Sequence, residues 1–102
     1  MGMERVISFP AGTPEWSVIR DRLLSAGASP AMRMIDGMPA FPDETPEPTW
    51  SELRITLGAG MMTIRREPTR LRVIVWGNAD EGLLGDLESV VQGCVAVGGE
   101  LV

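Results

Sequence analysis

The chain has 102 residues, of which 44% are hydrophobic and 23% charged, so we expect one globular domain over residues 1–102. Its net charge of −5 argues against non-specific binding to nucleic acid or to an anionic membrane. The chain contains no histidine and one cysteine, Cys94, so we expect neither a metal site nor an intramolecular disulfide.

The first third of the chain predicts a strand and a helix. Residues 5–9 are predicted to form a short strand, which Pro10 ends. Thr13 is a good helix N-cap and Pro14 fits the first turn, so we expect a helix that begins there and ends at Gly27. Its apolar stripe has helical spacing and comprises Trp16, Ile19, Leu23 and Ala26.

The next segment, residues 31–35, is predicted to be a second strand. Side chains of a strand alternate between its two faces, which places Met32 and Met34 together on one face. Arg33 and Ile35 fall on the opposite face.

A long, acidic loop is expected over residues 36–50. Its prolines forbid regular strand pairing, and they are Pro39, Pro42, Pro46 and Pro48. Loops of this length inside compact domains tend to be functional or mobile. We expect the apolar flanks Met38, Phe41 and Trp50 to gain from burial, and Trp50 to be at least partly packed. The acidic centre, residues 43–47, has little apolar surface and is expected to stay solvent-exposed and mobile.

A three-stranded meander is predicted over residues 52–58, 61–66 and 70–76, with tight turns at Ala59-Gly60 and Pro68-Thr69. On the inward face, this register pairs Leu57 with Met62, Ile55 with Ile64, Ile64 with Val73, and Met62 with Val75. On the outward face it aligns three arginines in one row, Arg54, Arg65 and Arg72. Like charges directly opposite one another destabilise a sheet unless an anion lies among them.

The last element is predicted to be an apolar-faced helix. Asn78 and Glu81 have the spacing of a capping box, and Gly98-Gly99 would end the helix. Its apolar residues repeat at helical spacing, and they are Leu83, Leu84, Leu87, Val90, Val91, Cys94 and Val97. Three glycines lower its helix propensity, which indicates a close packing approach, for instance to the sheet.

The predicted order is therefore strand, helix, four strands, helix. One antiparallel sheet with both helices packed on its apolar face satisfies every amphipathic pattern at once. We expect an α+β fold of this architecture. The opposite face, which carries the arginines, is either open to solvent or covered by the 36–50 loop.

Charge is strongly segregated along the chain. Residues 36–52 carry −5, whereas residues 53–76 carry +4, from five arginines against one glutamate. Arginine's planar fork can grip a carboxylate or a phosphate with two hydrogen bonds, and apolar side chains beside it are typical of interaction surfaces. The candidate binding residues on the outward face are Arg54, Arg65, Arg72, Met61, Ile74 and Trp76.

Two other interpretations of that face remain open. The arginines could be neutralised within the protein, because Glu52 and Glu67 are predicted opposite one another in the neighbouring row and the acidic loop could supply further carboxylates. The apolar side chains could be covered by Met38, Phe41 or Trp50 of the same loop.

These features favour a non-enzymatic domain that binds another protein, or a second copy of itself, through the outward face. The alternative is binding of a small anionic ligand or single-stranded nucleic acid there, because arginine forks and a stacking Trp76 would suit such a ligand. The acidic total charge weighs against nucleic acid. We do not expect an enzyme, because histidine and tyrosine are absent and Cys94 lies on an apolar helix stripe.

The sequence gives no indication of a cofactor site, a metal site or a membrane-spanning segment. The acidic residues of the loop do not match a calcium-binding loop, and no glycine-rich phosphate loop or dinucleotide fingerprint is present. No apolar run approaches the ~20 residues that span a bilayer, and the first residues lack the order of a signal peptide. We therefore expect a cytoplasmic protein without a cofactor.

Overall fold

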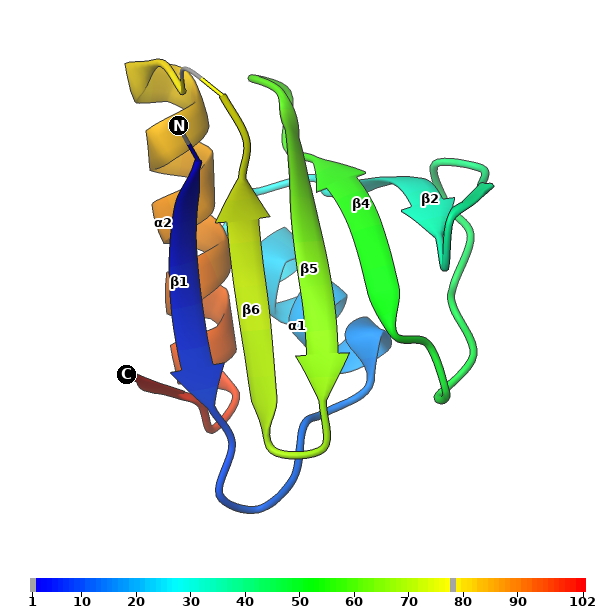
Figure 1. The fold of residues 1–102 in the computed structure, drawn as a ribbon, viewed down its shortest axis with the longest axis vertical. Helices are drawn as coiled ribbons and strands as arrows, with labels where there is room; N and C mark the ends of the chain where they lie inside the picture. The colour runs from blue at the N-terminus through cyan, green and yellow to red at the C-terminus, as the bar shows by residue number, and fades with distance from the viewer. Residues whose placement is uncertain (1, 78) are drawn as a thin grey trace.

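The computed structural model describes residues 2–77 and 79–102, and its seven strands form a single antiparallel sheet in the order β3-β2-β4-β5-β6-β1-β7 (Figure 1). In chain order, the elements are β1 (Met3–Ser8), α1 (Trp16–Ser25), β2 (Ala31–Ile35), β3 (Met38–Pro39), β4 (Glu52–Thr56), β5 (Met61–Glu67), β6 (Arg70–Val75), α2 (Glu81–Ala96) and β7 (Glu100–Leu101). The first strand lies beside the sixth, so residues far apart in the sequence pair directly within the sheet.

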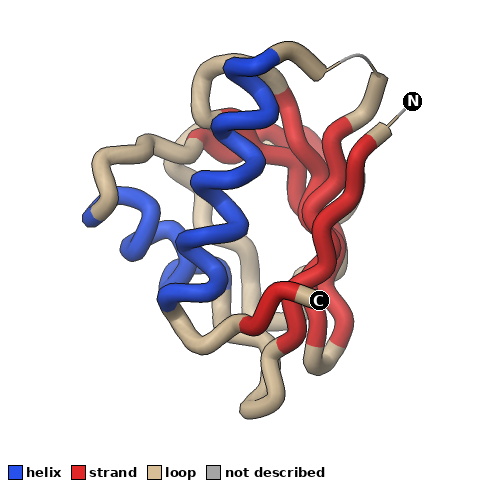
Figure 2. Tube along the Cα trace, turned by 90° about the vertical axis from the view of Figure 1, so that its left-hand side faces the viewer, coloured by secondary structure: helices blue, strands red, loops and turns tan. Residues whose placement is uncertain are grey.

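Both helices cover the same face of the sheet and form a separate layer (Figure 2). One hydrophobic core fills the space between the layers, and it takes side chains from both helices and from the inward face of every long strand. Its largest fully buried members include Trp50, Ile7, Ile19, Leu23, Met32 and Leu53. The predicted α+β class, with one antiparallel sheet and two helices on its apolar face, is confirmed. The short strands β3 and β7 were not predicted.

Helix α1 begins two residues later than the sequence predicts. Its N-cap is Glu15, which makes no side-chain capping bond. Thr13 has a different role, because its Oγ1 donates to the Glu67 carbonyl (2.8 Å) and ties the segment after β1 to the end of β5. The predicted stop is correct, since Gly27 follows the helix with a φ of +90°. Three residues of the predicted stripe are buried, whereas Ala26 is exposed.

Strand β2 contains an irregularity that the alternation of its side chains did not predict. Met32 pairs with Ile55 on the core side, but Met34 pairs with Arg54 on the opposite side, and the register shifts between the two. A bulge inserts one extra residue and re-aims the side chains that follow it. The prediction that Met32 and Met34 share a face is therefore wrong.

The register of β4 against β5 differs by two residues from the predicted one. Ile55 pairs with Met62 and Leu53 with Ile64, because a four-residue loop, 57–60, replaces the predicted two-residue turn. Helix α2 holds this loop in place. Asp86 accepts a hydrogen bond from the Ala59 N–H (3.1 Å), and Leu83 lies within van der Waals reach of the side-chain position at Gly60. The β5–β6 register, including the Ile64–Val73 pair, agrees with the prediction.

Helix α2 ends near the predicted glycines, with Gly98 at a φ of +107°. At its start, the predicted capping residue Asn78 lies outside the described residues, and the N-cap is Asp80, whose side chain accepts a hydrogen bond from the Leu83 N–H (2.8 Å). The position of Gly93 explains why a glycine occurs in this helix. A Cβ there would lie 2.8 Å from Leu23 Cδ2. The close approach at Gly93 is therefore to helix α1, whereas the sequence suggested an approach to the sheet.

The predicted loop begins with a tight hairpin. Asp36 and Gly37 connect β2 to β3, with φ values of 49° and 82°. The Asp36 carboxylate also holds the far end of the loop, because its Oδ1 accepts hydrogen bonds from the backbone N–H groups of Ser51 (2.8 Å) and Glu52 (2.9 Å) and from the Ser51 hydroxyl (3.0 Å). Hydrogen bonds to the ionised form hold the pKa of Asp36 below its usual 3.8.

The rest of the loop follows the helix layer and the outer edge of β2. The prediction that Trp50 is packed is confirmed, since its ring belongs to the core and the Arg66 guanidinium lies 5.3 Å from the ring centroid. Pro42 O accepts a hydrogen bond from the Met32 N–H (2.9 Å) at the free edge of β2. The expected gain from burial fails for Met38 and Phe41, both of which are exposed. Residues 43–47, which the sequence predicts to be exposed, are all exposed except Pro46.

Candidate interaction surface on the outer sheet face

The face of the sheet opposite the helices, here called the outer face, collects the candidate residues from four strands. Pairing across the sheet brings together Glu4 of β1, Glu52 and Arg54 of β4, Met61, Thr63, Arg65 and Glu67 of β5, and Arg72 and Ile74 of β6. Trp76 follows β6 directly. No described segment crosses in front of these strands when the sheet is seen from this side (Figure 1), so the 36–50 loop does not cover them.

The predicted arginine row is only partly formed. Arg65 and Arg72 are directly opposite one another, as predicted. Arg54 is opposite Thr63 because of the two-residue difference in register, and Glu52 takes the predicted place of Arg54 beside Arg65. An opposite charge therefore stands where a third like charge was expected, which removes part of the predicted repulsion.

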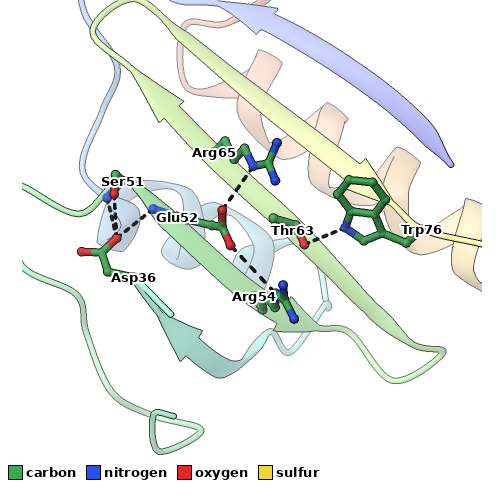
Figure 3. Close-up of polar contacts among 7 residues, drawn as sticks. All are labelled: Asp36, Ser51, Glu52, Arg54, Thr63, Arg65 and Trp76. Atoms are coloured by element: carbon green, nitrogen blue, oxygen red, sulfur yellow. Dashed lines mark hydrogen bonds and ion pairs between the residues drawn. The ribbon is translucent and has the colours of Figure 1, made fainter. Parts of the chain in front are cut away.

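Carboxylates of the sheet itself accompany all three arginines. Glu52 lies between two of them (Figure 3), with Oε2 at 3.2 Å from Arg65 Nε and Oε1 at 3.9 Å from Arg54 Nε. Arg72 lies between Glu67 and Glu4, each at 2.9 Å, and these hydrogen bonds raise the pKa of its guanidinium. The open interpretation of internal neutralisation is thus partly realised by Glu52 and Glu67. Among the described residues the acidic loop takes no part in it.

Trp76 is anchored on this face while most of its ring stays accessible. Its indole N–H donates to Thr63 Oγ1 (3.1 Å), and the Arg65 guanidinium lies 5.8 Å from the ring centroid (Figure 3). Trp76 is 58% exposed and Met61 50% exposed. Ile74 is only 6% exposed, so it contributes to the floor of the face and not to an accessible patch. The accessible apolar surface of the predicted set is therefore limited to Trp76 and Met61.

Two adjoining depressions run across the outer face from β2 to the end of β6, and together we call them the trough. One, of about 510 Å³, is lined by Arg33 and Met34 of β2, by Thr56 and by the 58–60 loop. The other, of about 530 Å³, is lined by Arg54, Thr63, Trp76 and Leu83. Met61 borders both depressions. The trough is thus a mixed surface of arginine, methionine and tryptophan.

Two of the residues that complete this face were not in the predicted set. Glu4 reaches Arg72 only because β1 lies beside β6, a long-range pairing that no local pattern of the sequence indicates. Thr63 was placed on the face, but its role as the acceptor for Trp76 depends on the direction of the indole ring. The alternation of β5 was the only available signal for Thr63.

Cys94 and the side chains able to ligate a metal bear on the chemistry of the described residues. Cys94 is buried in the core, and burial raises the pKa of its thiol to about 12. Residues 2–77 and 79–102 contain no group of three or more histidine, cysteine, aspartate or glutamate side chains placed to hold a metal ion. Within the same residues, no helix combines the length and the apolar character needed to cross a membrane.

Comparison of the chain with protein-family models, with curated proteins and with solved structures found no match.

Proposed function

We propose that this chain is a non-enzymatic interaction domain that binds another protein through its outer sheet face. The observation that carries the proposal concerns Trp76 and Met61. Both side chains are at least half exposed, and they lie on a face that no described segment covers. Tryptophan and arginine are the residues most enriched among those that dominate binding energy, and methionine adapts to varied partner shapes.

The ion pairs of this face support the proposal. Arg65 is held by Glu52 and stacks near Trp76, and Arg72 is held by two carboxylates. Side chains held in place before binding lose less conformational entropy when a partner docks. A protein partner can pack against the exposed apolar side chains of this face without breaking its ion pairs.

The alternative occupant, a small anion or single-stranded nucleic acid, uses the same face less well. At Arg65 or Arg72, a phosphate group would have to displace Glu4, Glu52 or Glu67, or bind beside their negative charge. The net charge of −5 opposes the approach of a polyanion. The geometry therefore favours a protein partner over this alternative.

A photo-crosslinking residue in place of Met61 tests the proposal in cells that produce the protein. The matched control carries the same residue in place of Val18, which has a similar exposed fraction but lies on helix α1, away from the outer face. We expect a discrete covalent adduct, with a second copy or with another protein, from position 61 only.

A further substitution, Trp76→Ser, should abolish that adduct while the fold, followed by circular dichroism, is retained. Adducts of equal yield from both positions, or adducts that persist after Trp76→Ser, would refute the proposed role of the outer face.

A further inference from the structure

The segment 41–47, here called the acidic segment, presents an uncovered aromatic ring beside three carboxylates. Phe41 is 75% exposed, and Asp43, Glu44 and Glu47 are exposed and form no ion pair with any described cation. The segment has a defined shape. The Glu44 N–H donates to the Phe41 carbonyl (3.0 Å), and the Phe41 N–H donates to Glu44 Oε1 (3.2 Å).

The trough offers the complementary set of groups. Arg33 is exposed and has no carboxylate within ion-pair distance among residues 2–77 and 79–102. Arg54 has only the 3.9 Å contact to Glu52, the longest of the ion pairs in that part of the chain. Arg65 and Arg72, which the sequence places at the centre of the site, are held by shorter contacts. The arginines available to a partner are therefore Arg33 and Arg54, and they flank Met61.

The acidic segment does not contact the trough of its own chain. It leaves the edge of β2 at Pro42 and passes along helix α1, where Arg20 Nη1 donates to Thr45 Oγ1 (2.9 Å). One chain thus exposes an acidic segment with an aromatic ring and a basic trough with a methionine and a tryptophan. The acidic segment and the β2 end of the trough both lie near the β2 edge of the sheet, and they do not contact each other within one copy.

We infer that the partner of the trough is the acidic segment of a second copy of this chain. The inference rests on the proposed function of the outer face and identifies its occupant. Phe41 of one copy packs against Met61 and Trp76 of the other, and its carboxylates bind Arg33 and Arg54. Because each copy carries both surfaces, two copies related by a twofold axis make the contact twice, which closes the assembly as a dimer.

Charge reversal on the two surfaces tests the inference with the protein itself as the probe. Sedimentation velocity would follow wild type, a trough variant (R33E/R54E) and a segment variant (D43R/E47R). The matched control for the trough variant is R22E/R70E, which lowers the net charge by the same amount at two exposed arginines outside the trough. We expect a dissociation constant for the dimer about tenfold or more higher in each of the first two variants, and unchanged in the control.

Mixing the two variants provides a decisive measurement. The acidic trough of R33E/R54E then faces the basic segment of D43R/E47R, and the unchanged segment of the first faces the unchanged trough of the second. The 1:1 mixture should therefore dimerise more tightly than either variant alone. A general loss of stability in either variant could not produce this recovery. Phe41→Ala should weaken the wild-type dimer without changing its net charge.

Two outcomes would overturn the inference. One is a wild type that stays monomeric up to about 1 mM, which corresponds to negligible affinity at cellular concentrations. The other is a mixture that stays monomeric while wild type dimerises. If either occurs while position 61 still crosslinks to a different protein, the proposed function stands and only the identity of the partner is wrong. If position 61 gives no specific adduct, both fail.

Discussion

The same substitution at two glycines of helix α2, Gly85→Ala and Gly93→Ala, should change stability in opposite directions. Alanine in place of glycine within a helix contributes about 1 kcal/mol through helix propensity at either position. At Gly85, a Cβ would meet no atom within 4 Å, so this gain should appear in full. At Gly93, the Cβ would lie 2.8 Å from Leu23 Cδ2 and 3.4 Å from Leu23 Cγ, and Leu23 is buried between the helices.

Overpacking of this kind destabilises a core by about 1–3 kcal/mol, which exceeds or cancels the propensity gain. We therefore expect Gly85→Ala to raise the free energy of unfolding by about 1 kcal/mol and Gly93→Ala to lower it by up to about 2 kcal/mol. For a domain of this size, each kcal/mol moves the melting temperature by about 4–8 °C. Urea and thermal unfolding, followed by circular dichroism, would measure both changes.

Leu23→Val provides the internal control, because valine lacks the Cδ2 atom that the new Cβ approaches most closely. In that background, the penalty of Gly93→Ala should shrink by about 1 kcal/mol, a coupling typical of residues in contact. The reasoning is refuted if Gly93→Ala stabilises the protein as much as Gly85→Ala does, or if the Leu23 substitution leaves its effect unchanged.

Three further predictions concern single side chains. Asp36→Asn keeps a residue that tolerates positive φ but removes the charge that accepts three hydrogen bonds, so the free energy of unfolding should fall by about 1–2 kcal/mol at pH 7. The pKa of Asp36 in the folded state lies below its usual 3.8. The higher free energy of unfolding of wild type should therefore be fully present above the unfolded pKa. It should disappear as the pH of the urea titrations is lowered through the folded pKa. Cys94 should resist iodoacetamide at pH 8 in the folded protein and react on unfolding in urea, and rapid labelling without denaturant would contradict its burial. Glu52→Gln should change stability by less than about 1 kcal/mol but free Arg65, so that phosphate shifts the NMR signal of Arg65 in the variant only.

The faces of the meander could be predicted from sequence, but its register could not. Alternation has a period of two, so a displacement of β4 by two residues keeps Leu53 and Ile55 inward and leaves the hydrophobic pattern unchanged. The choice between the two registers depends on the 57–60 loop. That loop is held by Leu83 and Asp86, which belong to a helix more than twenty positions further along the chain.

The candidate site shows the same limit. Met61, Trp76 and the arginines could be assigned to the outer face from alternation alone. Their accessibility depended on their neighbours, and so Ile74 proved to be buried although it lies on the same face. The partners of the arginines depended on register and on strand order, because Glu52 moved beside Arg65 and Glu4 came from the other end of the sequence.

The pairing of β1 with β6 has a consequence for the order in which the protein folds. The strands β4, β5 and β6 are joined by short loops, so their pairing closes little chain and should form early. The β1–β6 pairing joins segments more than sixty positions apart in sequence, and we expect it to form late. Until then Arg72 lacks one of its two carboxylates, because Glu4 arrives with β1. The outer face of the nascent sheet therefore has one carboxylate fewer beside Arg72, and this less neutralised arginine protects the open β6 edge from other chains until the first strand docks.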